Sequence, residues 1–204
     1  MKVKTSISMF VSGLLLASAA AVARVTISAE PSATPPATNS APMLVVFSAD
    51  SFSTPYTPSG WMGNTSAIAF NDHCTESPHS GSACIKVTYK APADWAGIAW
   101  QDPPDDWGDK DGGHNLTGAT KLTLWARGAT GGEKVDFYFG AIKPPKTFFD
   151  TATGKVSVTL TTDWKQYTID LSGKDLSRIK TGFGWSIAGQ GHPVTFYLDD
   201  IQYE

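Results

Sequence analysis

The stretch KLTLWARGATGGEKVDFYFG, residues 121–140, decides the fold class. Apolar and polar side chains alternate through residues 121–127 and again through 134–140, with Gly and Thr between the two runs. A period of two residues is typical of β-strands that bury one face. The stretch therefore predicts two strands joined by a turn. If these strands pair, four outward side chains share one face: Trp125, Arg127, Asp136 and Tyr138. The alternative is that these side chains pack under a loop that crosses the sheet.

The same alternation recurs along the rest of the chain. The other runs are residues 43–47, 67–70, 84–89, 96–100, 155–160, 165–171, 182–188 and 194–203. Together they predict an all-β fold of about ten short antiparallel strands. A jelly-roll β-sandwich is favoured, because the Cys–Trp–Cys spacing of immunoglobulin domains is absent. The stretch SGKDLSRIK, residues 172–180, is helix-like, and we expect at most two helical turns there.

The last run, VTFYLDDIQY at 194–203, changes its alternation at Asp199 and Asp200. A β-bulge at this point would keep the apolar residues on both sides of it inward. The bulge would also bury one carboxylate, and an isolated buried charge is costly. The sequence thus predicts either a cation or close backbone donors beside these aspartates, and calcium suits such a site because it accepts carboxylate and carbonyl oxygens.

Residues 1–42 precede the predicted domain. Lys2 and Lys4 come before an apolar run that ends in small residues, which indicates a secretory signal peptide, residues 1–23. Residues 24–42 are rich in Pro, Ser, Thr and Ala and predict an extended linker. Residues 43–204 form one domain by size. We expect a secreted protein, extracellular or periplasmic, without a membrane span.

Charge and cysteines narrow the function classes further. The formal net charge of the chain is −3, and loss of Lys2 and Lys4 with the signal peptide takes it to −5. Without a basic cluster, nucleic acid is a poor partner. Cys74 and Cys84 have nine residues between them, and in an oxidising compartment we expect a disulfide that closes this loop. A metal-binding pair is the alternative, although no further Cys or His has ligand spacing.

Five longer motifs resemble those of the β-sandwich carbohydrate-binding modules of the galactose-binding-like superfamily. The motifs are FSADSF (47–52), SACIKVTY (82–89), LTLWARG (122–128), DWKQYTIDLSG (163–173) and VTFYLDDIQYE (194–204). The resemblance covers nearly all of the predicted domain. It implies a structural calcium ion that ties the first strand to the last through Asp50 and Asp199 or Asp200. It does not identify the residues that contact a sugar.

Aromatic and polar residues in and beside loops supply the candidate ligand contacts. Sugar rings stack on flat apolar side chains and offer hydroxyl groups to polar ones. We predict stacking surfaces at Trp95, Trp100, Trp107, Trp125 and Tyr138, and hydroxyl contacts at Gln101, Arg127 and Asp136. Trp100 shares its strand parity with Ile98, which is equally compatible with the core. The Asp-rich segment 102–111 is open to sugar binding, a second calcium ion or turn formation.

The sequence therefore predicts a secreted, non-catalytic protein that binds a polysaccharide, acting alone or beside a separately encoded glycoside hydrolase. One alternative is a jelly-roll glycosidase or lyase. Glycosidases need two carboxyl groups at a set separation, and the chain has few glutamates in suitable places. The other alternative is a structural or adhesive surface protein that uses its aromatic face for a protein partner. Binding to insoluble polysaccharide would favour the binding protein, release of reducing sugar would favour the enzyme, and neither would favour the adhesive protein.

Overall fold

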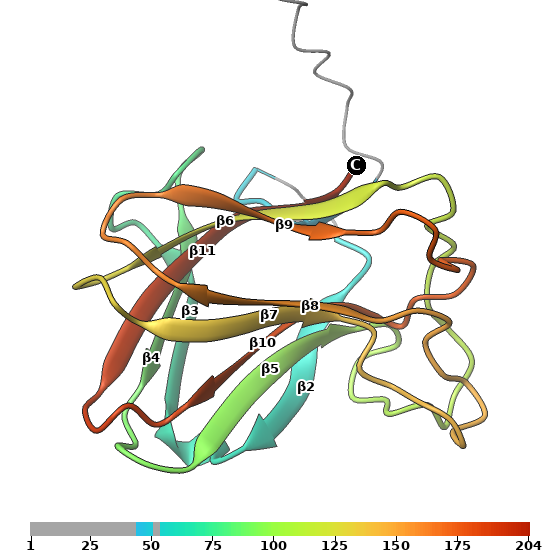
Figure 1. The fold of residues 1–204 in the computed structure, drawn as a ribbon, viewed down its shortest axis with the longest axis horizontal. Helices are drawn as coiled ribbons and strands as arrows, with labels where there is room; N and C mark the ends of the chain where they lie inside the picture. Colours follow the sequence, from blue (N-terminus) through green and yellow to red (C-terminus); the bar gives the residue numbers. More distant parts are fainter. Residues whose placement is uncertain (1–43, 51–53) are drawn as a thin grey trace, which may run out of the picture. The chain divides into compact units, whose positions relative to one another are not determined.

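The computed structural model describes residues 44–50 and 54–204. The predicted signal peptide (1–23) and linker (24–42) lie outside the described residues. Figure 1 shows two antiparallel sheets packed face to face. Within the described residues there are eleven strands: β1 (Leu44–Phe47), β2 (Thr57–Gly63), β3 (Ile68–Cys74), β4 (Cys84–Tyr89), β5 (Trp95–Gln101), β6 (Lys121–Gly128), β7 (Lys134–Phe139), β8 (Gly154–Thr159), β9 (Lys165–Asp170), β10 (Thr181–Ala188) and β11 (Val194–Tyr203).

Sheet A has the order β3-β4-β11-β6-β9, and β1 pairs with the end of β11. Sheet B has the order β2-β5-β10-β7-β8. The inward residues of the two sheets form one core, because alternate positions along most of the strands are apolar. Its largest side chains include Trp100, Trp185, Phe137, Phe183 and Phe196, all nearly inaccessible to solvent. The predicted β-sandwich is therefore confirmed.

All ten predicted runs are strands, and the structure adds one that the sequence did not predict. β2, TPSGWMG, contains Pro58 and two glycines and shows no alternation. It lies at the edge of sheet B, where a proline is tolerated because one side of the strand needs no ladder partner. Residues 172–180, for which the sequence allowed at most two helical turns, form no helix, and the single described helix is the 3-10 turn Thr65–Ala67. Leu176 and Ile179 in the expected helix are instead buried as parts of an irregular connection.

Residues 121–127 and 134–140, whose pairing the sequence left open, do not pair. β6 pairs with β11 and β9 in sheet A, and β7 pairs with β10 and β8 in sheet B. The connection between them crosses from one sheet to the other and uses positive φ angles of 80° at Gly131 and 94° at Gly132. Trp125 and Arg127 therefore lie on the opposite side of the sandwich from Asp136 and Tyr138.

The bulge predicted in β11 is confirmed. The register between β11 and β6 shifts between Asp199 and Gln202, and Asp200 has a φ of 43°. As expected, the apolar residues on both sides of the bulge remain inward and fully buried: Phe196, Leu198, Ile201 and Tyr203. Within the described part of the chain, no helix has the length and apolar character needed to cross a membrane.

Candidate functional site

The outer face of sheet B has a floor of small residues. In the two central strands the large side chains, such as Trp100 and Trp185, point into the core. The outward positions in the middle of these strands are Gly97 and Ala99 in β5, between Trp95 and Gln101, and Gly184, Ser186 and Ala188 in β10. Because none of these small side chains projects far, larger side chains such as Tyr138 can lie over them.

A groove opens on this face where β10 separates from β7. The pairs between these strands end at Ser186 and Asp136, whereas β10 stays paired with β5 as far as Ala188 and Trp95. The groove has a volume of about 880 Å³, which is within the range of ligand-binding sites. It runs across the strands, from Trp95 in β5 over β10 and β7 to Thr159 in the edge strand β8.

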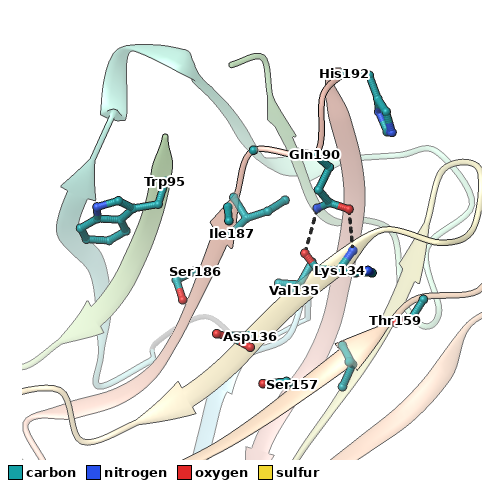
Figure 2. Close-up of a pocket in the computed structure, with 13 residues that line it drawn as sticks. Trp95, Lys134, Val135, Asp136, Ser157, Thr159, Ser186, Ile187, Gln190 and His192 are labelled. Carbon is teal, nitrogen blue, oxygen red and sulfur yellow. Dashed lines mark hydrogen bonds between the residues drawn. The ribbon is translucent and has the colours of Figure 1, made fainter. Parts of the chain in front are cut away.

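Figure 2 shows Trp95 on one side of the groove and the residues of β7 and β8 on the other, with Ser186 of β10 between them. Trp95 is 51% exposed and is one of two large apolar side chains of the described residues that stand out into solvent; the other is Trp61. An exposed indole at the rim of a groove is a flat platform for a ligand.

Tyr138 lies beside the groove on the same face. A Cβ atom at Gly184 would come within 2.4 Å of the tyrosine ring, so the ring lies directly over this glycine. Its hydroxyl is buried without a hydrogen-bond partner, and burial raises the pKa of Tyr138 well above the ordinary value. A side chain at position 184 would therefore clash with this ring, and glycine avoids the clash.

Asp136 is the charged group in the middle of the groove. Its carboxylate accepts a hydrogen bond from Nζ of Lys155 at 3.0 Å. Partial burial opposes ionisation, but the hydrogen bonds from Ser157 and Lys155 outweigh it and hold the pKa of Asp136 below its ordinary value. The groove thus presents an ionised carboxylate together with further polar lining residues: Lys134, Ser157, Thr159, Ser186, Gln190 and His192.

Three of the predicted contacts, Trp95, Asp136 and Tyr138, lie on this one face. Trp107 is half-buried in the loop after β5 and is not among the residues that line the groove. Trp100 is wrong as a sugar contact, because it is 2% exposed and packs against Phe183 in the core. Gln101 is wrong as well: it is buried, and its amide Nε2 donates to the backbone oxygen of Asp106.

Trp125 and Arg127 are outside the groove because they lie on the outer face of sheet A. The ring of Trp125 stacks on His79 with centroids 3.7 Å apart. The Arg127 guanidinium lies 3.6 Å from the centre of the Tyr197 ring and donates to the backbone oxygen of Glu76. Both side chains hold the segment between β3 and β4 against the sheet. They therefore follow the alternative given by the sequence, in which outward side chains pack under a loop that crosses the sheet.

The aspartates of the segment 102–111 mostly build the loop itself. Asp106 is buried, pairs with Nζ of Lys180 at 2.7 Å and accepts backbone N–H groups of Gly108, Asp109 and Lys110. Burial opposes this charge, but these partners hold the pKa of Asp106 below its ordinary value. Asp109 pairs with Lys146 at 2.7 Å. Turn formation, rather than exposed ligand binding, accounts for these carboxylates.

The three predicted calcium ligands meet at one turn, residues 79–81. Asp199 is fully buried and accepts hydrogen bonds from the N–H groups of His79 (3.0 Å), Ser80 (3.2 Å) and Asp200 (2.9 Å). Burial raises the pKa of Asp199 above its ordinary value, although these hydrogen bonds act to lower it. The Asp50 carboxylate lies against Gly81. Three backbone N–H groups thus satisfy the Asp199 carboxylate. In the described residues no three acidic, His or Cys side chains are arranged to hold an ion, and calcium stays a prediction.

Cys74 and Cys84 are direct partners across β3 and β4, and both are buried. Their thiols are free in the structure, so the predicted disulfide is not formed there. Burial, first of all, raises the pKa of Cys84 to about 12, with the neighbouring Cys74 adding to the effect.

Sequence reasoning missed most of the polar groove residues, including Ser186, Gln190 and His192. A signal was present for the floor: the outward positions of GFGWSIA are all Gly, Ser or Ala. The polar residues of β8 and of the turn 189–193 carry no such signal. A local sequence pattern does not specify which strands lie beside β7.

Comparison with known proteins finds similarity of fold. No family model and no curated protein matches the sequence. The family 30 carbohydrate-binding module of a cellulosomal cellulase from Clostridium thermocellum has a TM-score of 0.56 and 17% identity, over 79% of this chain and 96% of that module. Another structure of a family 30 module has a TM-score of 0.55 and 16% identity, over 79% and 97%. The family 11 module from Clostridium thermocellum, solved with a β-1,3-1,4-mixed-linked tetrasaccharide, has a TM-score of 0.50 and 13% identity, over 78% and 94%. The predicted resemblance to β-sandwich carbohydrate-binding modules is confirmed at the level of fold.

Proposed function

We propose that the protein binds a polysaccharide chain in the groove on the outer face of sheet B and does not cleave it. The observation that carries the proposal is the combination of Trp95, an exposed indole, with a cross-strand groove lined by hydrogen-bonding groups. Pyranose rings present apolar C–H faces and polar edges. The indole would stack on the faces, and Asp136, Ser157 and Ser186 would bind hydroxyl groups.

The shape of the groove supports a chain as the ligand. The groove crosses the strands and reaches the edge strand β8, and the outward residues of β10 that line it, Ser186 and Ala188, are small. A linear ligand can therefore lie along the groove over several strands. The related family 11 module was solved with a mixed-linked tetrasaccharide, which makes mixed-linked β-glucan the first probe.

The carboxyl groups of the groove favour binding over hydrolysis. Among the described residues that line the groove, Asp136 is the one carboxylic acid. Retaining and inverting glycosidases act with a pair of carboxyl groups on either side of the scissile bond. Asp136 is also held ionised by Lys155, whereas a general acid needs a raised pKa.

We propose further that the protein is secreted through the signal peptide at residues 1–23. There it would act beside a separately encoded glycoside hydrolase. A polysaccharide of a cell wall or matrix is too large to enter a cell, so its binding protein has to be exported. A hydrolase that shares the polysaccharide would gain local concentration from a protein bound to the same chain.

Affinity electrophoresis and pull-down with mixed-linked β-glucan, cellulose, xylan and chitin test the proposal, together with an assay for reducing sugar. We expect retention by at least one polysaccharide and no release of reducing sugar. Release of sugar would instead indicate the enzyme. Absence of both would favour the adhesive protein.

A further inference from the structure

The turn between β10 and β11, residues 189–193, bridges the two sides of the groove. β10 leaves β7 after the pair Ser186–Asp136, although β7 begins two residues earlier, at Lys134. The backbone N–H and C=O groups of Lys134 therefore have no partner in β10. An unpaired strand end of this kind would normally bind water or move.

The side chain of Gln190 takes the place of the missing strand partner (Figure 2). Its Nε2 donates to the carbonyl oxygen of Lys134 at 3.0 Å, and its Oε1 accepts the N–H of Lys134 at 3.1 Å. Two reciprocal bonds to one residue are what a strand residue makes in a hydrogen-bonded antiparallel pair. The amide of Gln190 thus continues the ladder across the gap.

The backbone of the same turn is attached to the other side of the groove. The N–H of Gly189 donates to the carbonyl oxygen of Asp94 at 2.8 Å, and the N–H of Gly191 donates to that of Pro92 at 2.9 Å. A Cβ atom at Gly189 would lie 2.4 Å from Cα of Ala93, so the two segments are in close contact. Asp94 directly precedes Trp95, the exposed indole of the groove.

We propose that Gln190 is a positioning residue that fixes the width of the groove, by joining the segment that carries Trp95 to the strand that carries Asp136. The inference rests on the proposed function. Loss of the amide would leave the start of β7 free to separate from the turn. A ligand would then have to bring the two sides together again, and this ordering costs binding free energy.

Gln190→Ala and Gln190→Glu test the role through a pH profile. Alanine removes both hydrogen bonds, and we expect about a tenfold loss of affinity for the polysaccharide that the wild type binds. Ionised glutamate repels the Lys134 carbonyl, so Gln190→Glu should bind as weakly as Gln190→Ala at about pH 7. Protonated glutamate can donate to this carbonyl and accept the Lys134 N–H. Its affinity relative to wild type should therefore recover as the pH falls toward about 4, whereas that of Gln190→Ala should not.

The wild type, measured at each pH, corrects for titration of Asp94, Asp136 and His192, which lie near the turn. Thr123→Val is the matched control on sheet A, where the Thr123 hydroxyl donates to Glu204 at 2.9 Å. It should lower stability and leave affinity unchanged. Wild-type affinity in Gln190→Ala, or no recovery in Gln190→Glu at low pH, overturns the proposal while polysaccharide binding stands.

A ligand-free measurement separates this inference from the proposed function. In Gln190→Ala the amide of Lys134 should exchange faster with solvent, and the indole resonance of Trp95 should shift. If the wild type binds no polysaccharide, the proposed function fails and these two signals alone judge the role of Gln190. Unchanged signals would overturn it.

Discussion

Trp95 and Trp125 have similar sequence surroundings, each in or beside a strand, but they have opposite environments. Trp95 is 51% exposed beside the groove, whereas Trp125 is covered by His79 on the far face. Trp95→Ala should weaken polysaccharide binding by about 1 to 3 kcal/mol with little change in the melting temperature. Isothermal titration and calorimetric melting measure the two effects.

Trp125→Ala is the matched control for this prediction, because it removes the same side chain from the far face. It should destabilise the fold by about 2 kcal/mol and leave the affinity unchanged. Equal affinity of Trp95→Ala and wild type would show that the indole is not a binding surface.

Asp136 should give the stability of the protein a measurable acid dependence. Its pKa in the folded state lies below the ordinary 3.8, so the hydrogen bonds from Ser157 and Lys155 to the ionised carboxylate stabilise the fold above that pH. This stabilisation is lost as the pH falls through the lower folded-state pKa. The difference in urea midpoint between wild type and Asp136→Asn should be largest near about pH 6 and shrink below about pH 4. A difference that does not vary with pH would contradict the assignment, and replacing Lys155 by Met should reduce the difference without abolishing it, because the hydrogen bond from Ser157 remains.

Strands and their parities could be predicted from the sequence, but sheet membership could not. Alternation fixes which side chains of KLTLWAR and KVDFYFG point inward, and both sets are buried as expected. Alternation carries no information on the partner strand, and the turn ATGGE is equally compatible with a hairpin and with a crossing between sheets. That single ambiguity placed Trp125 and Arg127 at the site, and it hid the residues of β8 and the turn 189–193.

The predicted disulfide concerns the connection between β3 and β4. The nine residues between Cys74 and Cys84 predicted a closed loop, and the structure places the two cysteines opposite each other. Protein purified from an oxidising compartment should show no reactive thiol after unfolding, and reduction should lower its stability by about 3 kcal/mol. Thiol titration and melting with and without reductant measure both.

The Cys74→Ser, Cys84→Ser variant is the control for reduction, because it should melt like the reduced protein with or without reductant. In reduced wild type the pKa of Cys84, raised by burial to about 12, should keep this thiol unreactive until the protein unfolds. Two titratable thiols in the oxidised, unfolded protein would contradict the disulfide.

Over the whole molecule, the two ends of the domain meet in one sheet, because β1 pairs with the last residues of β11. The change of alternation at Asp199–Asp200 predicted the bulge, and the resemblance to carbohydrate-binding modules implied that Asp50 lies near it. The sequence left two ways to satisfy a buried carboxylate there, a cation or backbone donors. The structure has three backbone donors on Asp199, and a carboxylate that already accepts them keeps free lone pairs for an ion.

Calcium binding at this junction should therefore appear as a stability difference for the whole domain. If an ion joins Asp50 to Asp199 and Asp200, Ca²⁺ at about 100 times its Kd should stabilise the fold by about 2.7 kcal/mol, and a chelator should remove this gain. Melting with Ca²⁺ and with chelator measures it, and Asp50→Asn should abolish the difference while leaving the backbone bonds to Asp199 in place. Identical melting in both conditions would mean that the N–H groups of His79, Ser80 and Asp200 hold the buried charge alone. The junction of the first and last strands would then depend on the bulge geometry and not on a metal.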